Sequence, residues 1–455
     1  MTGVLSACEA TYKADSLEQS LKEVLSKEYD IQQVEVRTKG KTLGVYLPLE
    51  KLFSANLDAF SSANLDDGIS NLFEFNKDAM DKVEDVLFTT SRVVLSTDKE
   101  IDFYVLKAVE TKSTGIEFVL TGNVMDMKQV RFWHIPLSEY RKRLLHDLSV
   151  NRTIVWKRTI TDFFDSIGKI TTVDLFNTYF ANDITIKDIS PFFFAQLAEA
   201  EHKEDLRYEM IDIRTKPINE REVLVYVKQA EQFTPRKEDI EQEYLFLNGQ
   251  QHEYLFVLQA DKMAYKVRQV IPFYFVNKET NKLHAIDFPD ELKIYDNIGS
   301  WSEEFELEEV LMGPFLAHQL TKRIQALVAQ DEELATSFLL KKIECVYHDE
   351  KSEVTNEGPL PKYFSIEYDL GAQAFMSVSL YPNKEREEIE DAIRDLLKII
   401  VSEFTVVVNG YSYRDFSYLE LINSDSGKAV IIPSHDLQSI NIGEMSIDSF
   451  ITQKE

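Results

Sequence analysis

The chain has 455 residues, and its 50 Lys and Arg against 78 Asp and Glu give a net charge of −28. Such a field repels a phosphate backbone, and the densest basic run, Arg141-Lys142-Arg143, is interpreted as a solvated helix face, so we expect no nucleic-acid ligand. The hydrophobic fraction of 44% is ordinary for a globular protein, and the length exceeds what one hydrophobic core supports. The composition therefore predicts an acidic protein of two or three domains.

The two cysteines, Cys8 and Cys345, cannot build a disulfide framework. Cys345 lies in a segment that predicts a strand, where a small buried hydrophobe is its default role. No apolar run approaches the length that a membrane-spanning helix needs.

The start of the chain contains one segment with the pattern of a targeting signal, Leu5-Ser6-Ala7-Cys8 after Val4. A branched apolar residue and two small residues before Cys resemble the lipobox of bacterial lipoproteins. In that family the signal peptide is cut before the cysteine, which then carries lipid. The resemblance, confined to these residues, implies lipidation at Cys8 and a protein held at a membrane surface in the bacterial cell envelope. The alternative is an ordinary cytoplasmic N-terminus.

Residues 1–15 are predicted to form this lipobox-like start and a polar tether, and residues 16–150 a first α+β domain. Leu17, Leu21 and Leu25 recur at helical spacing after Ser16, which can cap a helix. The further patterns predict, in chain order, strands at 31–37 and 42–48, a helix at 76–95, strands at 101–109 and 115–121, and a helix at 138–148.

Residues 151–300 are predicted to form a second α+β domain that is richer in strands. It opens with helical segments in which aromatic residues such as Phe163 and Phe164 recur. The strand patterns that follow lie at 206–213, 222–227, 254–259, 270–275 and 283–286.

Residues 301–455 are predicted to form a third α+β domain. Ser302, followed by acidic residues, predicts a helix start, and helical patterns run to about residue 337. Later patterns predict strands at 340–348, 363–369 and 373–381, a helix at 384–403, and strands at 405–408, 418–422 and 429–432.

One pattern of helix, strand, polar turn and strand occurs at both 83–126 and 393–436. Asp102-Phe103-Tyr104-Val105-Leu106 lines up with Asp415-Phe416-Ser417-Tyr418-Leu419. The third domain is therefore a candidate repeat of the first, and the alternative is convergent strand periodicity.

These patterns predict an α+β protein of several modules, each a mostly antiparallel sheet with helices packed on one face. Short polar turns between strands join antiparallel neighbours. The helices at 76–95 and 384–403 each carry one apolar stripe, which suffices to cover one sheet face. We expect the opposite face to be free for a partner.

No local motif identifies a catalytic, cofactor-binding or metal site. Gly40-Lys41-Thr42 has Glu35 where a phosphate-binding loop needs Gly, so it predicts a hairpin turn. His252-Glu253 has Phe256 where a zinc-protease motif needs His. Cys8, as a lipidation site, is the one functional residue that we predict.

The favoured hypothesis is a non-catalytic, membrane-tethered envelope lipoprotein that acts as a protein-binding or scaffold module, with a protein partner and the membrane surface reached through Cys8. One alternative is a hydrolase whose site is assembled from distant residues, because such a site leaves no local motif. Another is a chaperone-like accessory protein that receives apolar clients. The sequence does not indicate an oligomeric state.

Overall fold

The computed structural model describes most of the chain from residue 11 to residue 441. The described residues are 11–55, 73–112, 115–184, 189, 193, 197, 200, 203–235, 248–249, 251–261, 264–277, 282–285, 301, 304–331, 334, 342–349, 361–369, 384–424 and 426–441. Cys8 and the strand predicted at 373–381 lie outside them. Among the described residues we find no helix whose length and hydropathy would let it cross a bilayer.

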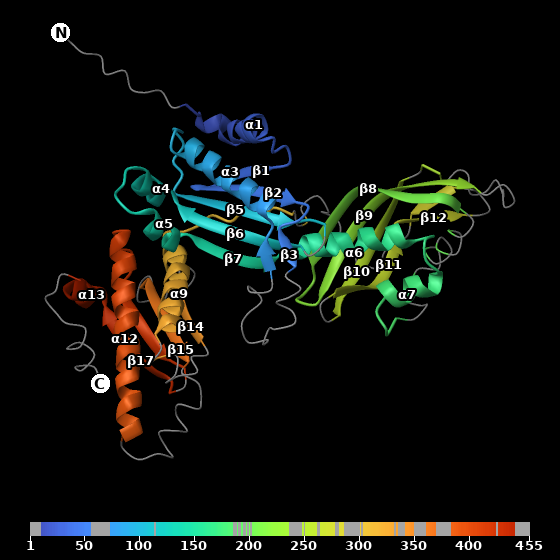
Figure 1. The fold of residues 1–455 in the computed structure, drawn as a ribbon. Helices are drawn as coiled ribbons and strands as arrows, with labels where there is room; N and C mark the ends of the chain where they lie inside the picture. The colour runs from blue at the N-terminus through green and yellow to red at the C-terminus, as the bar shows by residue number, and fades with distance from the viewer. Residues whose placement is uncertain are drawn as a thin grey trace, which may run out of the picture.

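The N-terminal module is built on a five-stranded sheet of order β1-β2-β5-β6-β7, in which only β2 and β5 are paired in parallel. Figure 1 shows it next to both other modules, and its buried residues pack with residues of each. Its elements are η1 (Ala14–Ser16), α1 (Leu17–Tyr29), β1 (Glu35–Lys39), β2 (Thr42–Leu49), β3 (Phe53–Ala55), β4 (Phe73–Phe75), α3 (Lys77–Val94), β5 (Phe103–Glu110), β6 (Ile116–Asn123), α4 (Val124–Arg131), α5 (Leu137–Arg143) and β7 (Leu145–Val150).

Both faces of this sheet are covered, contrary to the expectation of an open face. Helices α1 and α3 bury their apolar stripes, including Leu21 and Val86, on one face. Residues 304–310, which we call the strap, cross the other face, where Phe305 and Leu307 pack with Tyr46. Gly44 permits this approach, because a Cβ there would lie 2.6 Å from a methyl group of Leu307. The strap lies in the range predicted for the third domain.

The middle module is an antiparallel sheet of order β11-β10-β9-β8 with helices on one face. Its core is aromatic, with Phe163, Phe164 and Phe256 packed ring against ring. Its elements are α6 (Arg152–Ser166), α7 (Thr172–Tyr179), β8 (Lys203–Pro217), β9 (Glu222–Pro235), β10 (Gln251–Asp261), β11 (Ala264–Pro272) and the separate pair β12 (Tyr274–Asn277) and β13 (Lys282–Ala285).

The C-terminal module has a four-stranded sheet of order β14-β15-β16-β17, in which β15 and β16 are parallel. The described part of this module comprises α9 (Met312–Gln330), β14 (Lys342–His348), β15 (Tyr363–Asp369), α12 (Lys384–Gly410), β16 (Tyr418–Asn423), β17 (Lys428–Pro433) and α13 (Ser434–Asn441). Residues of α9 and α12 form its core with the sheet, and Cys345 is buried there as predicted.

The N-terminal and C-terminal modules follow the same path. In each, a helix, a hairpin, a long helix and a second hairpin follow one another, and the two hairpins meet through a parallel central pair, β2 with β5 and β15 with β16. Each second hairpin leads directly into a short helix, α4 after Asn123 and α13 after Pro433. The segments that lined up in the sequence lead into equivalent central strands, β5 and β16, although the strand pairing matches Phe103 with Tyr418 and so shifts the sequence match by two residues.

The structure confirms the α+β class with mostly antiparallel sheets and corrects three elements. The helix predicted at 138–148 ends at Arg143, and β7 begins at Leu145. The helix predicted to begin at Ser302 begins at Met312 instead, because the strap is not helical. The strand predicted at 405–408 is part of α12, where Phe404, Val407 and Val408 enter the core. Burial thus outweighs the strand preference of the β-branched residues.

Candidate functional site

Residues 132–137, which are the loop between α4 and α5 together with Leu137 at the start of α5, display large apolar side chains. Asn123 caps α4 by accepting a hydrogen bond from the backbone N–H of Met125. At the other end the backbone N–H of Trp133 donates to the carbonyl of Val130, and that of His134 donates to the carbonyl of Gln129. These two bonds form a Schellman motif, in which the residue after the C-cap adopts a left-handed conformation and is usually Gly. We call residues 132–137 the aromatic loop.

Trp133 occupies that left-handed position, with φ at 60°. A side chain there costs about 1 kcal/mol relative to Gly. Burial does not offset this cost, because Trp133 is 91% exposed, and its neighbours Phe132 and Leu137 are 66% and 54% exposed. Neither backbone preference nor packing explains an indole at this position, so the loop is a candidate binding surface.

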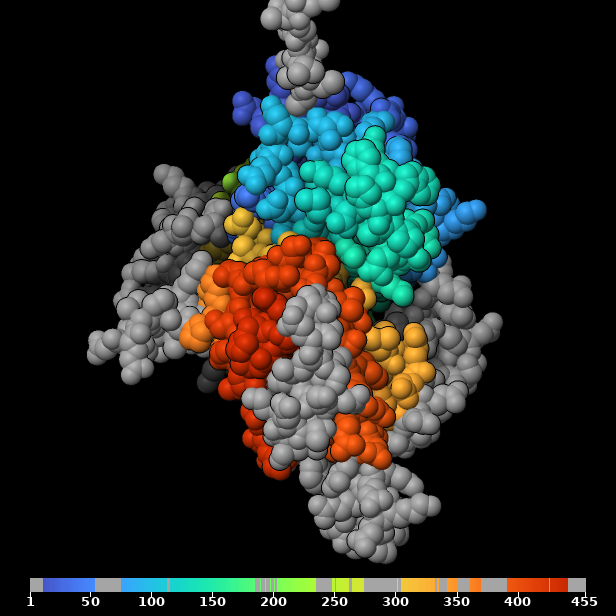
Figure 2. Space-filling model, turned by 90° about the vertical axis from the view of Figure 1, so that its left-hand side faces the viewer, coloured from blue at the N-terminus to red at the C-terminus, as the bar shows by residue number. Residues whose placement is uncertain are grey.

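The aromatic loop is flanked by basic residues in a protein of net charge −28. Lys128 and Arg131 precede it on α4, and Arg141 and Lys142 follow it on α5, all of them exposed. Figure 2 shows this green-cyan part of the N-terminal module on one face of the molecule, directly above the orange and red C-terminal module. The surface therefore combines apolar and cationic groups.

A cleft of about 400 Å³ lies beside it, between α5 and β7 of the N-terminal module and α9 and α12 of the C-terminal module. One face of α9 supplies half of the lining, since its contributing residues recur at helical spacing. The lining residues are Arg141, Lys142, Leu144, Leu145, His146, Gln319, Lys322, Arg323, Ala326, Leu327, Gln330 and Glu403. We call this the basic cleft, because four of these side chains are Lys or Arg.

Ion pairs between the N-terminal and C-terminal modules stabilise the walls of the cleft. Asp147 on β7 accepts from Lys322 at 2.9 Å and lies 3.3 Å from the His318 ring nitrogen. The hydrogen bond from His318, followed by that from Lys322, lowers the pKa of Asp147 to about 2. Arg323 pairs with both Glu139 and Glu403. The two modules are therefore joined by charged contacts that also line the cleft.

A buried network lies behind the cleft. Arg143 donates to Asp126 and Glu139, each at 2.9 Å, and the Tyr411 hydroxyl donates to the other oxygen of Asp126 at 2.5 Å. Burial raises the pKa of Asp126 above its usual value. The Gln319 amide donates to the Arg143 carbonyl at 2.7 Å, so that its nitrogen faces the N-terminal module. This network fixes α9 against α5.

Gln319 is 1% exposed, and its side-chain oxygen has no hydrogen-bond partner. A buried polar atom without a partner costs about 1–3 kcal/mol, so such atoms are rare in folded proteins. Within the described part of the chain, Arg141 and Lys142 also form no ion pair. The cleft thus offers two cations to a ligand, and its wall contains one buried hydrogen-bond acceptor that has no partner.

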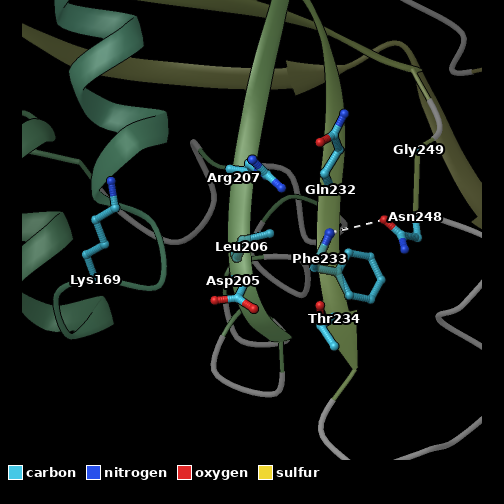
Figure 3. Close-up of a pocket in the computed structure, with 9 residues that line it drawn as sticks. All are labelled: Lys169, Asp205, Leu206, Arg207, Gln232, Phe233, Thr234, Asn248 and Gly249. Carbon is cyan, nitrogen blue, oxygen red and sulfur yellow. Dashed lines mark hydrogen bonds between the residues drawn. The ribbon is translucent and has the colours of Figure 1, made fainter.

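A second cavity, of about 820 Å³, lies in the middle module (Figure 3). Its described charged groups are Lys169, Asp205 and Arg207, and Figure 3 shows them spread around β8 rather than directed at one point. The Phe233 backbone N–H donates to the Asn248 side-chain oxygen at 3.1 Å, which is the dashed line in Figure 3. The mixed charges of this cavity give it no clear ligand preference, so we favour the basic cleft.

The same module buries polar side chains on the sheet face under α6. Lys203 and Glu231 form an ion pair there, while both polar atoms of the Gln229 amide and one His252 nitrogen have no partner. Burial lowers the pKa of His252. His252, which began the rejected zinc-protease motif, lies in β10, and no group of metal-ligating residues occurs in the described ranges.

Sequence reasoning named Cys8, which lies outside the described residues, and missed the aromatic loop and the cleft. The run Arg141-Lys142-Arg143 was the available signal, because it is a basic segment in an acidic chain. Its interpretation as a solvated face holds for Arg141 and Lys142, which are exposed, but not for Arg143. Gly40-Lys41-Thr42 forms the predicted turn between β1 and β2.

The fold defines a multidomain α+β protein, and this surface is its candidate binding site at a module contact. Comparisons with protein-family models, curated proteins and solved structures found no match to the chain.

Proposed function

We propose that the protein is a non-catalytic, membrane-tethered envelope lipoprotein that binds a protein partner through the aromatic loop. The observation that carries the proposal is Trp133, which is almost fully exposed at a position where the backbone favours Gly. Trp and Arg are the residues most enriched among those that dominate protein–protein binding energy. Lipidation of Cys8 would hold the module at the membrane surface.

The loop specifies the chemistry of the partner surface. Phe132, Trp133 and Leu137 require an apolar pocket, and Arg131 with Arg141 favours acidic residues around that pocket. The Schellman bonds fix the backbone on which the rings stand, so little conformational entropy is lost on binding. These features support a scaffold role better than a small-molecule reaction at this surface.

The proposal is tested by placing a photo-crosslinking amino acid at position 133 in the native host. The matched control places it at Val173, which is 69% exposed on α7 of the middle module. A protein crosslinked from position 133 alone should bind the purified chain, and Trp133→Ala should weaken that binding by about 30-fold or more, as expected for a dominant interface residue. Val173→Ala should leave the affinity unchanged.

Two outcomes would overturn the proposal. One is crosslinking to lipid instead of protein from position 133, which would make the loop a membrane contact. The other is equal loss of affinity in both alanine variants. Lipidation is tested separately by mass spectrometry of the native N-terminus, where an unmodified thiol at Cys8 would refute the tether and leave the loop proposal standing.

A further inference from the structure

We propose that the basic cleft binds the phosphate group of a small ligand that also carries a hydroxyl group. The cleft volume of about 400 Å³ lies in the range of small-molecule sites and is too small for a folded partner. This site shares Arg141 and Lys142 with the flank of the aromatic loop but uses none of the apolar side chains of the loop, and the proposal does not depend on the function proposed for that loop.

The charges of the cleft specify an anion. Glu403 is the one carboxylate among the lining residues, and Arg323 pairs with it. Lys322 forms an ion pair with Asp147, so Arg141 and Lys142 are the cations that remain for a ligand. An Arg guanidinium and a Lys ammonium are the groups that most often bind phosphate in proteins. The presence of both at one cleft is unusual here, since the chain as a whole is strongly acidic.

Gln319 specifies the second feature of the ligand. Its amide nitrogen is held by the Arg143 carbonyl, which can only accept, so the amide cannot rotate to exchange its two ends without losing that bond. Its oxygen therefore remains a buried acceptor without a partner in the wall of the cleft. The oxygen is shielded from solvent, so a ligand hydroxyl that reaches it as the wall of the cleft opens would supply the missing hydrogen bond and remove its cost.

The ligand chemistry can come from a soluble phosphate ester or from the headgroup of an anionic lipid. The probes are glycerol phosphate, propyl phosphate, and vesicles of phosphatidylcholine with or without phosphatidylglycerol. Binding is measured by calorimetry for the soluble probes and by flotation for the vesicles, with the full chain purified without lipid. Glycerol phosphate should bind about fivefold or more tightly than propyl phosphate, which lacks the hydroxyl groups.

The test variant is Arg141→Gln with Lys142→Gln, and its matched control is Lys169→Gln with Arg207→Gln at the second cavity, which removes the same charge. The test variant should lose about tenfold or more in affinity and the control should lose little, since the lost contacts are charge-assisted. Binding of glycerol phosphate identifies a soluble ligand. Binding to phosphatidylglycerol vesicles alone, lost in the test variant, identifies a lipid headgroup.

The proposal is overturned if no probe binds, if both double variants lose the same affinity, or if propyl phosphate binds as tightly as glycerol phosphate. Trp133→Gly should bind the soluble phosphate probes like the wild type. Failure of the aromatic loop to bind a protein partner would therefore leave this result unchanged, and the reverse also holds.

Discussion

Four strands of the N-terminal sheet share one topology with the C-terminal sheet, but the two sheets differ in what lies on their second face. In the N-terminal module the strap buries that face, with Phe305 stacked on Tyr46 at 5.4 Å. In the C-terminal module the same face carries a partly exposed ladder of rings, His348, Tyr363 and Tyr418, at 4.3 and 4.6 Å. Strand order therefore does not determine whether a sheet face is buried. In the N-terminal module the strap, which is distant in the sequence, buries it.

The largest expected effect on stability comes from removing the Phe305 ring of the strap. Phe305→Ala should lower the free energy of unfolding by about 3–5 kcal/mol, because the ring is 1% exposed and its removal leaves a cavity. Tyr418→Ala on the exposed face of the C-terminal sheet should cost about 1 kcal/mol, the value of one stacked contact. Urea unfolding measures both, and equal losses would refute the contrast between the two faces.

The next effect concerns the contact that joins the two modules. Arg143→Met should cost about 3 kcal/mol, because it leaves the Asp126 carboxylate buried without its cation. Since burial already raises the pKa of Asp126, the loss should shrink on acidification, when the carboxyl becomes neutral. The control, Arg214→Met, breaks a half-exposed pair with Asp212 and should cost under about 1 kcal/mol.

A smaller effect is the pH dependence that Asp147 contributes. Its pKa falls from 3.8 to about 2 in the folded chain, so its contribution is present above pH 3.8 and disappears as the pH falls toward 2. Asp147→Asn should therefore cost about 1–2 kcal/mol at neutral pH and nothing near pH 2. Unfolding curves at several pH values test this, and a constant difference between variant and wild type would contradict it.

The smallest effect is expected at the aromatic loop. Trp133→Gly should leave the protein as stable as the wild type or stabilise it by up to about 1 kcal/mol, because Gly favours the left-handed backbone. Thermal unfolding is the measurement, with Val173→Gly in α7 as a control that should destabilise. A clear loss of stability in Trp133→Gly would show that the indole has a structural role.

The elements that the sequence predicts well are those in which local pattern and tertiary burial agree. Helices α1 and α3 are of this kind, since their apolar residues follow one helical period. The strand predicted at residues 405–408 was wrong because β-branched side chains favour a strand, whereas packing in the C-terminal core keeps these residues in α12. Local pattern cannot reveal a requirement that distant residues impose.

The candidate site could not be predicted for the same reason. The walls of the basic cleft come from α5 and α9, which the whole middle module separates in the chain. The strain at Trp133 is equally invisible in the sequence, because it follows from the way α4 ends. The sequence did contain the basic run on α5, but the role of this run depends on α9, which packs beside α5.

The hydrogen bond between Asn151 and Glu304 has a consequence for how such a chain could have arisen. The Asn151 side chain, where the chain leaves the N-terminal module, donates to the backbone carbonyl of Glu304, where the chain returns, at 3.0 Å. Everything between them is an excursion that begins and ends at nearly one point. The middle module therefore has the position of a domain inserted between two similar modules. A short linker could replace it without moving the contacts between the N-terminal and C-terminal modules.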